Sequence, residues 1–111
     1  MPTFDAGAVV RVPFPYIDRP VRQYRPALVI SRKPVGQGGE LLWVLMITSA
    51  ENRRWATDIP IPAGTDSGLP VDSLVRTAKI ATIEASSARR LGQLPEPLLS
   101  LVNEQVRATI G

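Results

Sequence analysis

Two short segments carry side chains that are suited to holding a phosphate group. Arg25 stands immediately before Pro26, at the start of an apolar segment, and Thr48 and Ser49 follow directly on the most apolar run of the chain, residues 41–47. A guanidinium donates a planar fork of hydrogen bonds to phosphate oxygens, and a hydroxyl donates to an oxygen that gains negative charge during a reaction. Because the ends of neighbouring antiparallel strands can lie side by side, we expect these groups to meet in one pocket. Taken singly, a surface ion pair would account for Arg25 and a turn cap would account for the two hydroxyls.

The residue types that are missing exclude several kinds of catalytic and metal site. The 111 residues include no cysteine and no histidine. This excludes disulfide scaffolds, thiolate metal sites and thiol nucleophiles, together with the common histidine-dependent triads and proton shuttles. The sequence contains no Walker motif, dinucleotide-binding glycine motif or nucleophile elbow. Each acidic residue falls in an expected loop or on an exposed helix face, so no carboxylate pair is placed for acid and base catalysis.

The charge of the chain favours an anionic partner only weakly. The formal net charge is +3, and every basic residue except Lys33 and Lys79 is an arginine. Arginine suits phosphate binding and base stacking, whereas a compositional bias of the genome would produce the same excess. No apolar run approaches the roughly 20 residues that cross a bilayer, and residues 1–7 lack the apolar region of a signal peptide. We therefore expect a cytoplasmic protein that does not enter a membrane.

The elements that must position these groups are predicted to be short strands. Prolines and glycines recur along the chain and separate short apolar stretches, which is typical of a mainly β protein. We expect strands at residues 9–14, 27–30, 41–47, 57–62, 73–76 and 79–83, a loop at residues 16–24, and a helical turn at residues 86–90 that stops at Gly92. From Glu96 or Pro97 onward the spacing predicts an amphipathic helix. Residues 1–111 are thus predicted to form one mainly β domain, a barrel of about five to seven strands with a C-terminal helix, of SH3-like architecture.

The segment at residues 41–47 is apolar on both faces of its expected strand. A strand of a small antiparallel barrel usually buries one face, so the second apolar face needs cover from another part of the protein. We expect this cover to come from the helix or from a second subunit.

Several blocks of sequence follow one another in a fixed order along nearly the whole chain. They are GAVVRVPFP at residues 7–15, RPALVIS at 25–31, MITS at 46–49, DIPI at 58–61, GLP at 68–70, SLVR at 73–76, KIATI at 79–83 and LGQL at 91–94. Taken together, these blocks resemble the PemK/MazF family of toxins from type II toxin-antitoxin systems. The resemblance implies a homodimer of SH3-like barrels and an endoribonuclease that cuts single-stranded RNA at short sequences without a metal or a cofactor.

The resemblance also implies roles for individual residues. The paired arginine and threonine of the family map onto Arg25 and Thr48, which would act as the catalytic residues, with Ser49 beside them. The implied cleavage is attack of a ribose 2'-hydroxyl on the adjacent phosphate, which leaves a 2',3'-cyclic phosphate and a 5'-hydroxyl end. The implied partners are single-stranded RNA along the dimer interface and a cognate antitoxin whose flexible tail covers the RNA site.

Further substrate contacts are expected in two loops and at one strand end. Aromatic side chains beside arginines offer stacking faces and phosphate charge to single-stranded RNA. The expected substrate-binding residues, besides Ser49, are Tyr16 and Arg22 in the first long loop, Asn52 and Arg53 after the apolar strand, and Arg76 as a second phosphate ligand. Trp55 is open to two interpretations, an RNA contact or a core residue.

The sequence departs from the family in three places, which keeps two alternatives open. Ala8 stands where family members often carry an acidic residue, and Ala78 where some carry an aspartate. The first long loop has Arg19, Arg22 and Gln23 where some members carry a histidine, so a mechanism that relies on such an acid or histidine is excluded. The first alternative is a toxin of the same fold that acts by binding protein, in the manner of the gyrase poisons. The second is a noncatalytic RNA-binding barrel, because a fold alone does not decide function.

Overall fold

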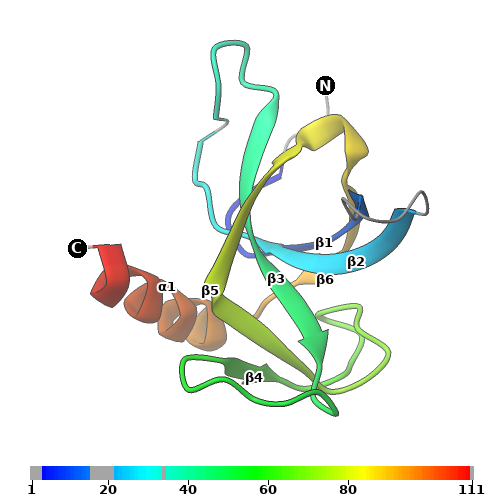
Figure 1. Cartoon of the computed structure of the whole chain (residues 1–111), viewed down its shortest axis with the longest axis vertical. Helices are drawn as coiled ribbons and strands as arrows, with labels where there is room; N and C mark the ends of the chain where they lie inside the picture. Colours follow the sequence, from blue (N-terminus) through cyan, green and yellow to red (C-terminus); the bar gives the residue numbers. More distant parts are fainter. Residues whose placement is uncertain (1–3, 16–21, 34, 111) are drawn as a thin grey trace.

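The computed structural model describes residues 4–15, 22–33 and 35–110, and this part of the chain forms a curled antiparallel sheet and one long helix (Figure 1). The elements are β1 (Ala8–Pro15), β2 (Arg22–Val29), β3 (Leu41–Ser49), β4 (Ile59–Ile61), β5 (Ser73–Glu84), the 3-10 turn η1 (Ala85–Ser87), β6 (Arg89–Gln93) and α1 (Glu96–Ile110). Within the described residues the sheet has six strands in the order β4-β5-β3-β2-β1-β6. The predicted mainly β barrel with a C-terminal helix is confirmed.

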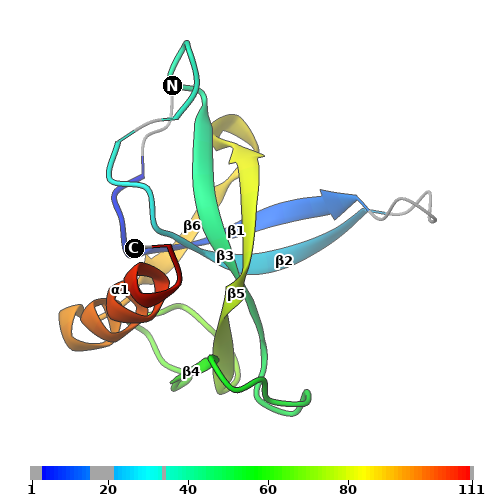
Figure 2. The same cartoon turned by 60° about the vertical axis from the view of Figure 1, so that its left-hand side comes forward.

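The short connection between β5 and β6 explains why the sheet curls. β6 pairs with β1 at one edge of the sheet, whereas β5 lies next to the opposite edge. The 3-10 turn at Ala85–Ser87 is the main link between these two strands. Because so short a link spans only a small distance, the sheet must bend until its two sides approach. Figure 2 shows the result, with the β1–β2 pair projecting to one side of the molecule and α1 lying on the other.

The curl creates two separate apolar cores, one on each face of the sheet. Alternate residues of a strand point to opposite faces, so Leu45 joins the cluster that α1 covers through Leu99 and Val102. Val44 joins the second cluster, which the strands enclose together with Ala85 from η1. The strand that is apolar on both faces is thus covered by the helix on one face, as expected, and by the curl of its own sheet on the other.

Three elements differ from the sequence-based expectation. β2 begins at Arg22, so residues 22–24 of the predicted loop are strand and pair with β1. The two short strands predicted at residues 73–76 and 79–83 are one strand, β5, whose pairing with β3 is irregular: Leu45 lies opposite Ile80 and the next residue, Met46, lies opposite Arg76. The helical turn predicted at residues 86–90 is wrong beyond η1, because residues 89–93 form β6 and pair with β1. The polar sequence of β6 carries no local strand pattern, and its pairing depends on closure of the sheet.

The helix begins where the sequence predicts. The carbonyl oxygen of Pro95 accepts hydrogen bonds from the backbone N–H groups of Leu98 and Leu99, which starts the first turn at Glu96. The apolar stripe of α1 packs on the core through Leu99 and Val102. Across the ranges that the structure describes, no helix is long and apolar enough to span a membrane.

Candidate active site

An open groove of about 670 Å³ lies beside the loop at residues 64–72, where the first half of β2 runs next to the end of β3. Four residues expected at the site line it: Arg25, Thr48, Ser49 and Asn52. The groove also has an apolar floor, to which Ile47 of β3 contributes. The structure therefore places the arginine and the two hydroxyls at one groove.

Strand register accounts for the placement of Arg25 and Thr48. The β2–β3 ladder pairs Ala27 with Met46. Arg25 stands two residues before Ala27 and Thr48 two residues after Met46, so strand alternation places both on the same face, just beyond this pair. Arg25 is also held from the other side, because it lies opposite Val12 of β1. Both Arg25 and Thr48 are half-buried, and both line the groove.

A hydrogen bond orients the Thr48 hydroxyl. The Asn52 side-chain Nδ2 donates to Thr48 Oγ1 over 2.6 Å. The backbone N–H of Asn52 donates to the carbonyl oxygen of Ser49 over 3.0 Å, and that of Glu51 donates to Ser49 Oγ over 3.2 Å, so the turn after β3 is closed. Because Thr48 Oγ1 accepts from Asn52, its own hydrogen is left to donate elsewhere. This arrangement suits a hydroxyl that must donate to an anionic oxygen.

One charged groove residue, Arg11, was not anticipated from the sequence, and it lies against Tyr24, the last residue of the loop in which substrate contacts were expected. The Arg11 guanidinium carbon lies 4.3 Å from the centre of the Tyr24 ring, and both exposed side chains line the groove. The signal in the sequence is the position of Arg11 between the buried residues Val10 and Val12, which marks a charged side chain on the open face of a strand. The groove thus carries a second guanidinium beside an aromatic ring.

Arg76 does not line the groove, in contrast to its expected role as a second phosphate ligand. Its Nη2 donates to the Arg53 carbonyl oxygen over 2.9 Å, its Nη1 lies 3.4 Å from Asp58 Oδ2, and its guanidinium carbon lies 4.0 Å from the Trp55 ring centre. The Asp58 side chain is fully buried, and a buried carboxylate requires a counter-charge. The expected role of Arg76 is therefore corrected. Arg76 neutralises Asp58 beneath the loop that joins β3 to β4.

The other residues expected at the site either do not line the groove or lie outside the residues that the structure describes. Tyr16 is not among the described residues, and Arg22 is described only as the first residue of β2, where it pairs with Pro15. Arg53 is exposed and contributes its carbonyl oxygen to Arg76. Trp55 is 41% exposed, so the interpretation of Trp55 as a core residue is wrong. Within the ranges that the structure describes, no three acidic residues gather closely enough to share a metal ion.

One family of known proteins matches nearly the whole chain. A family model described as the PemK-like, MazF-like toxin of type II toxin-antitoxin systems matches residues 5–110. A comparison with curated proteins gives no match.

Solved structures share the fold over nearly the whole chain. A MazE-MazF crystal form from Deinococcus radiodurans is 23% identical, with a TM-score of 0.77 and coverage of 96% of this chain and 95% of that one. An endoribonuclease in complex with its cognate antitoxin, from a mycobacterial species, is 16% identical, with a TM-score of 0.74 and coverage of 98% and 96%. The Mycobacterium tuberculosis toxin MazF-mt6 is 23% identical, with a TM-score of 0.71 and coverage of 93% and 95%.

Proposed function

This chain belongs to the PemK-like, MazF-like toxins of type II toxin-antitoxin systems, and from that premise we propose that it is a metal-independent endoribonuclease. The proposed substrate is single-stranded RNA, cut at short sequences, and the proposed consequence is inhibition of growth. The observation that carries the proposal is the presence of Arg25 and Thr48 at one groove, with Asn52 bound to Thr48 Oγ1. These groups match a reaction in which the RNA supplies its own nucleophile.

The proposed reaction is an internal transfer of the phosphodiester. The ribose 2'-oxygen forms a bond to the neighbouring phosphorus, and the bond between phosphorus and the 5'-oxygen of the next nucleotide breaks. The 2'-hydroxyl loses one proton and the departing 5'-oxygen gains one, so the products are a 2',3'-cyclic phosphate and a 5'-hydroxyl end with no water consumed. The protein need only hold the phosphate in line and stabilise the charge that builds on its oxygens.

Each groove residue has a distinct proposed part in this reaction. The Arg25 fork binds two phosphate oxygens, and the Thr48 hydroxyl donates to the oxygen that gains charge in the transition state. Asn52 sets the direction of that donation by occupying the acceptor side of Thr48 Oγ1. Ser49 borders the same groove and contacts the substrate beside Thr48. Arg11 adds a cation on the wall formed by β1.

The proposed partners are a second copy of this chain and an antitoxin. Among the three solved structures reported above, one is a MazE-MazF structure from Deinococcus radiodurans and one is an endoribonuclease in complex with its cognate antitoxin from a mycobacterial species. The exposed arginine Arg11 and the apolar floor at Ile47 would suit an antitoxin segment that carries both acidic and apolar side chains.

Cleavage of a long single-stranded RNA in EDTA tests the nuclease proposal. We expect discrete cuts with 5'-hydroxyl and cyclic phosphate ends from the protein freed of antitoxin. Arg25→Ala and Thr48→Ala should lose the cuts, and Thr48→Ser, which keeps the hydroxyl, should retain them. Arg107→Ala removes an exposed arginine of α1 and serves as the matched control. Intact RNA from folded protein on substrates of varied sequence would overturn the proposal and favour a protein-directed toxin or a binding module.

A further inference from the structure

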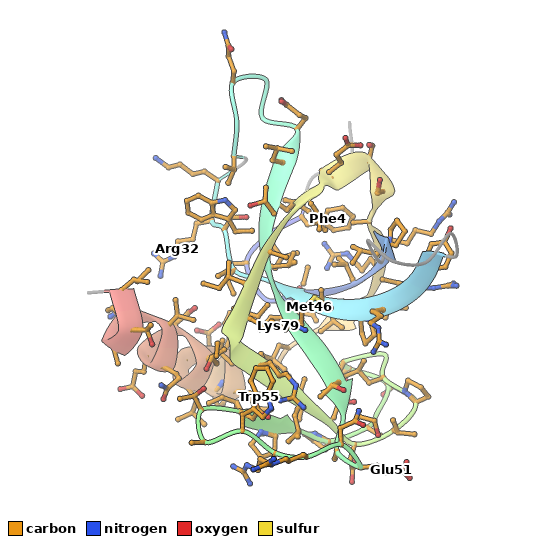
Figure 3. The ribbon with its side chains drawn as sticks, in the orientation of Figure 1. Phe4, Arg32, Met46, Glu51, Trp55 and Lys79 are labelled. Atoms are coloured by element: carbon orange, nitrogen blue, oxygen red, sulfur yellow. The ribbon has the colours of Figure 1, made fainter. Side chains whose placement is uncertain are left out.

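The loop that joins β3 to β4 (residues 50–58, the β3–β4 loop) carries Trp55, and one face of its indole ring already contacts another side chain of the protein. The Trp55 ring centre lies 4.0 Å from the guanidinium carbon of Arg76, and Arg76 is buried beneath it. The indole is nevertheless 41% exposed. Figure 3 shows Trp55 beside the β5 ribbon and above β4, with Glu51 marking the other part of the loop where β3 ends. One side of the indole thus rests on a cation while part of its surface stays open.

Contacts from below fix the position of this indole. The backbone N–H of Trp55 donates to Asp58 Oδ2 over 2.8 Å, and the N–H of Asp58 donates to the Trp55 carbonyl oxygen over 3.1 Å. Arg76 donates to the carbonyl oxygen of Arg53 over 2.9 Å, which holds the preceding part of the loop. The loop is therefore held against β5 in the absence of a ligand. Stacking of a ligand on the indole would thus cost little entropy for ordering the loop.

The loop connects this indole directly to the groove. Asn52 lines the groove, and Trp55 follows three residues later, so their Cα atoms lie within about 10 Å of each other. The two residues between them, Arg53 and Arg54, are both exposed. The residues that follow Asn52 thus offer two exposed cations and then an exposed aromatic surface. Cations that follow a backbone and aromatic rings on which bases stack are the two components of single-strand binding sites.

We propose that Trp55 is a stacking platform for an unpaired nucleobase of the RNA, outside the phosphate that is cleaved. The backing by Arg76 makes the platform rigid, and Arg53 and Arg54 contribute charge to the adjoining phosphates. The inference rests on the proposed function, since the same RNA strand occupies the groove and the platform. It adds a subsite that the groove itself does not contain, because Trp55 and Arg76 are not groove-lining residues.

Tryptophan fluorescence tests the platform directly. The chain has two tryptophans, so Trp43→Phe leaves Trp55 as the reporter. The probe is a mixed-sequence single-stranded oligonucleotide with 2'-O-methyl riboses, which lacks the attacking hydroxyl and cannot be cut by the proposed reaction. We expect it to quench Trp55, and we expect a duplex of the same length to quench it far less, because bases in a duplex are already stacked.

Binding measured by anisotropy of the labelled oligonucleotide supplies the magnitude. Trp55→Ala should weaken binding by about 5- to 150-fold, the range that corresponds to loss of one stacked base. Trp55→Phe keeps an aromatic ring and should retain most of the affinity, which separates stacking from a general effect on folding. Arg107→Ala again serves as the control, with unchanged affinity expected.

The outcomes separate failure of the platform from failure of the nuclease proposal. Oligonucleotide binding without quenching of Trp55, or with equal affinity in Trp55→Ala, would overturn the platform even if RNA is still cut. Conversion of a dimer to a monomer by Trp55→Ala in sedimentation would also overturn it, since the indole would then be covered by a second copy. Quenching of Trp55 by the oligonucleotide from a protein that cuts no RNA would support the platform while the nuclease proposal fails.

Discussion

Replacement of Arg76 by methionine should cost this protein a large part of its stability. The Asp58 side chain is fully buried and that of Arg76 is 10% exposed, with 3.4 Å between Arg76 Nη1 and Asp58 Oδ2. Methionine keeps an apolar stem of similar length but leaves the Asp58 carboxylate buried without its counter-charge. Removal of one partner of a buried ion pair typically costs about 3–5 kcal/mol, against a total stability of about 5–15 kcal/mol for a domain. We therefore expect Arg76→Met to lower the free energy of unfolding by about 4 kcal/mol.

Urea unfolding at a fixed protein concentration measures this loss, since association would make stability depend on concentration. Arg107→Met, at an exposed position of α1, is the matched control and should change stability by less than about 0.5 kcal/mol. Addition of Asp58→Asn to Arg76→Met removes the uncompensated charge and should recover part of the loss. A loss below about 1 kcal/mol in Arg76→Met, or a double variant less stable than Arg76→Met alone, would refute this account of the pair.

Three further changes test other parts of the structure. Gly68 has a φ of +73°, and Gly68→Ala places a Cβ against a backbone carbonyl oxygen of β6. Thermal unfolding should therefore show a loss of stability above about 1 kcal/mol. Gly64→Ala, which has open space around its Cβ, should not show this loss. Leu28→Ala removes a side chain with no exposed surface and should cost about 2–5 kcal/mol in urea unfolding; a smaller loss would mean that the core collapses around the gap. Asn52→Ala removes the donor to Thr48 and should lower kcat by about 2- to 12-fold with little change in KM, as measured on a defined RNA, whereas a rise in KM alone would assign Asn52 to RNA binding instead.

Local patterns in the sequence were sufficient for the elements that depend on near neighbours. The alternation around Val10 and Val12 predicts β1, and the apolar run at residues 41–47 predicts most of β3. The prolines that flank Glu96, followed by an apolar stripe, predict the start of α1. These features have periods of two or three to four residues, which is the distance over which backbone geometry repeats.

Strand β6 and the role of Arg76 could not be predicted in this way. Residues 89–93 have no alternating pattern, and they form a strand because closure of the sheet brings them to the edge of β1. An arginine that binds phosphate and an arginine that neutralises a buried carboxylate look alike in a sequence. Only the irregular register of β5, which sets Arg76 opposite Met46 and near Asp58, distinguishes them.

The sequence by itself determined the family resemblance, the mainly β architecture with its C-terminal helix, and the pair Arg25 and Thr48 as the groups suited to phosphate chemistry. The tertiary structure decided which side chains share the groove, added Arg11 beside Tyr24, and showed that Arg76 lies against Trp55 and not in the groove. The physical reason is that residue types and periods are local properties of the chain, whereas a site is assembled by strand register and sheet curvature, which arise from contacts between segments far apart in the sequence.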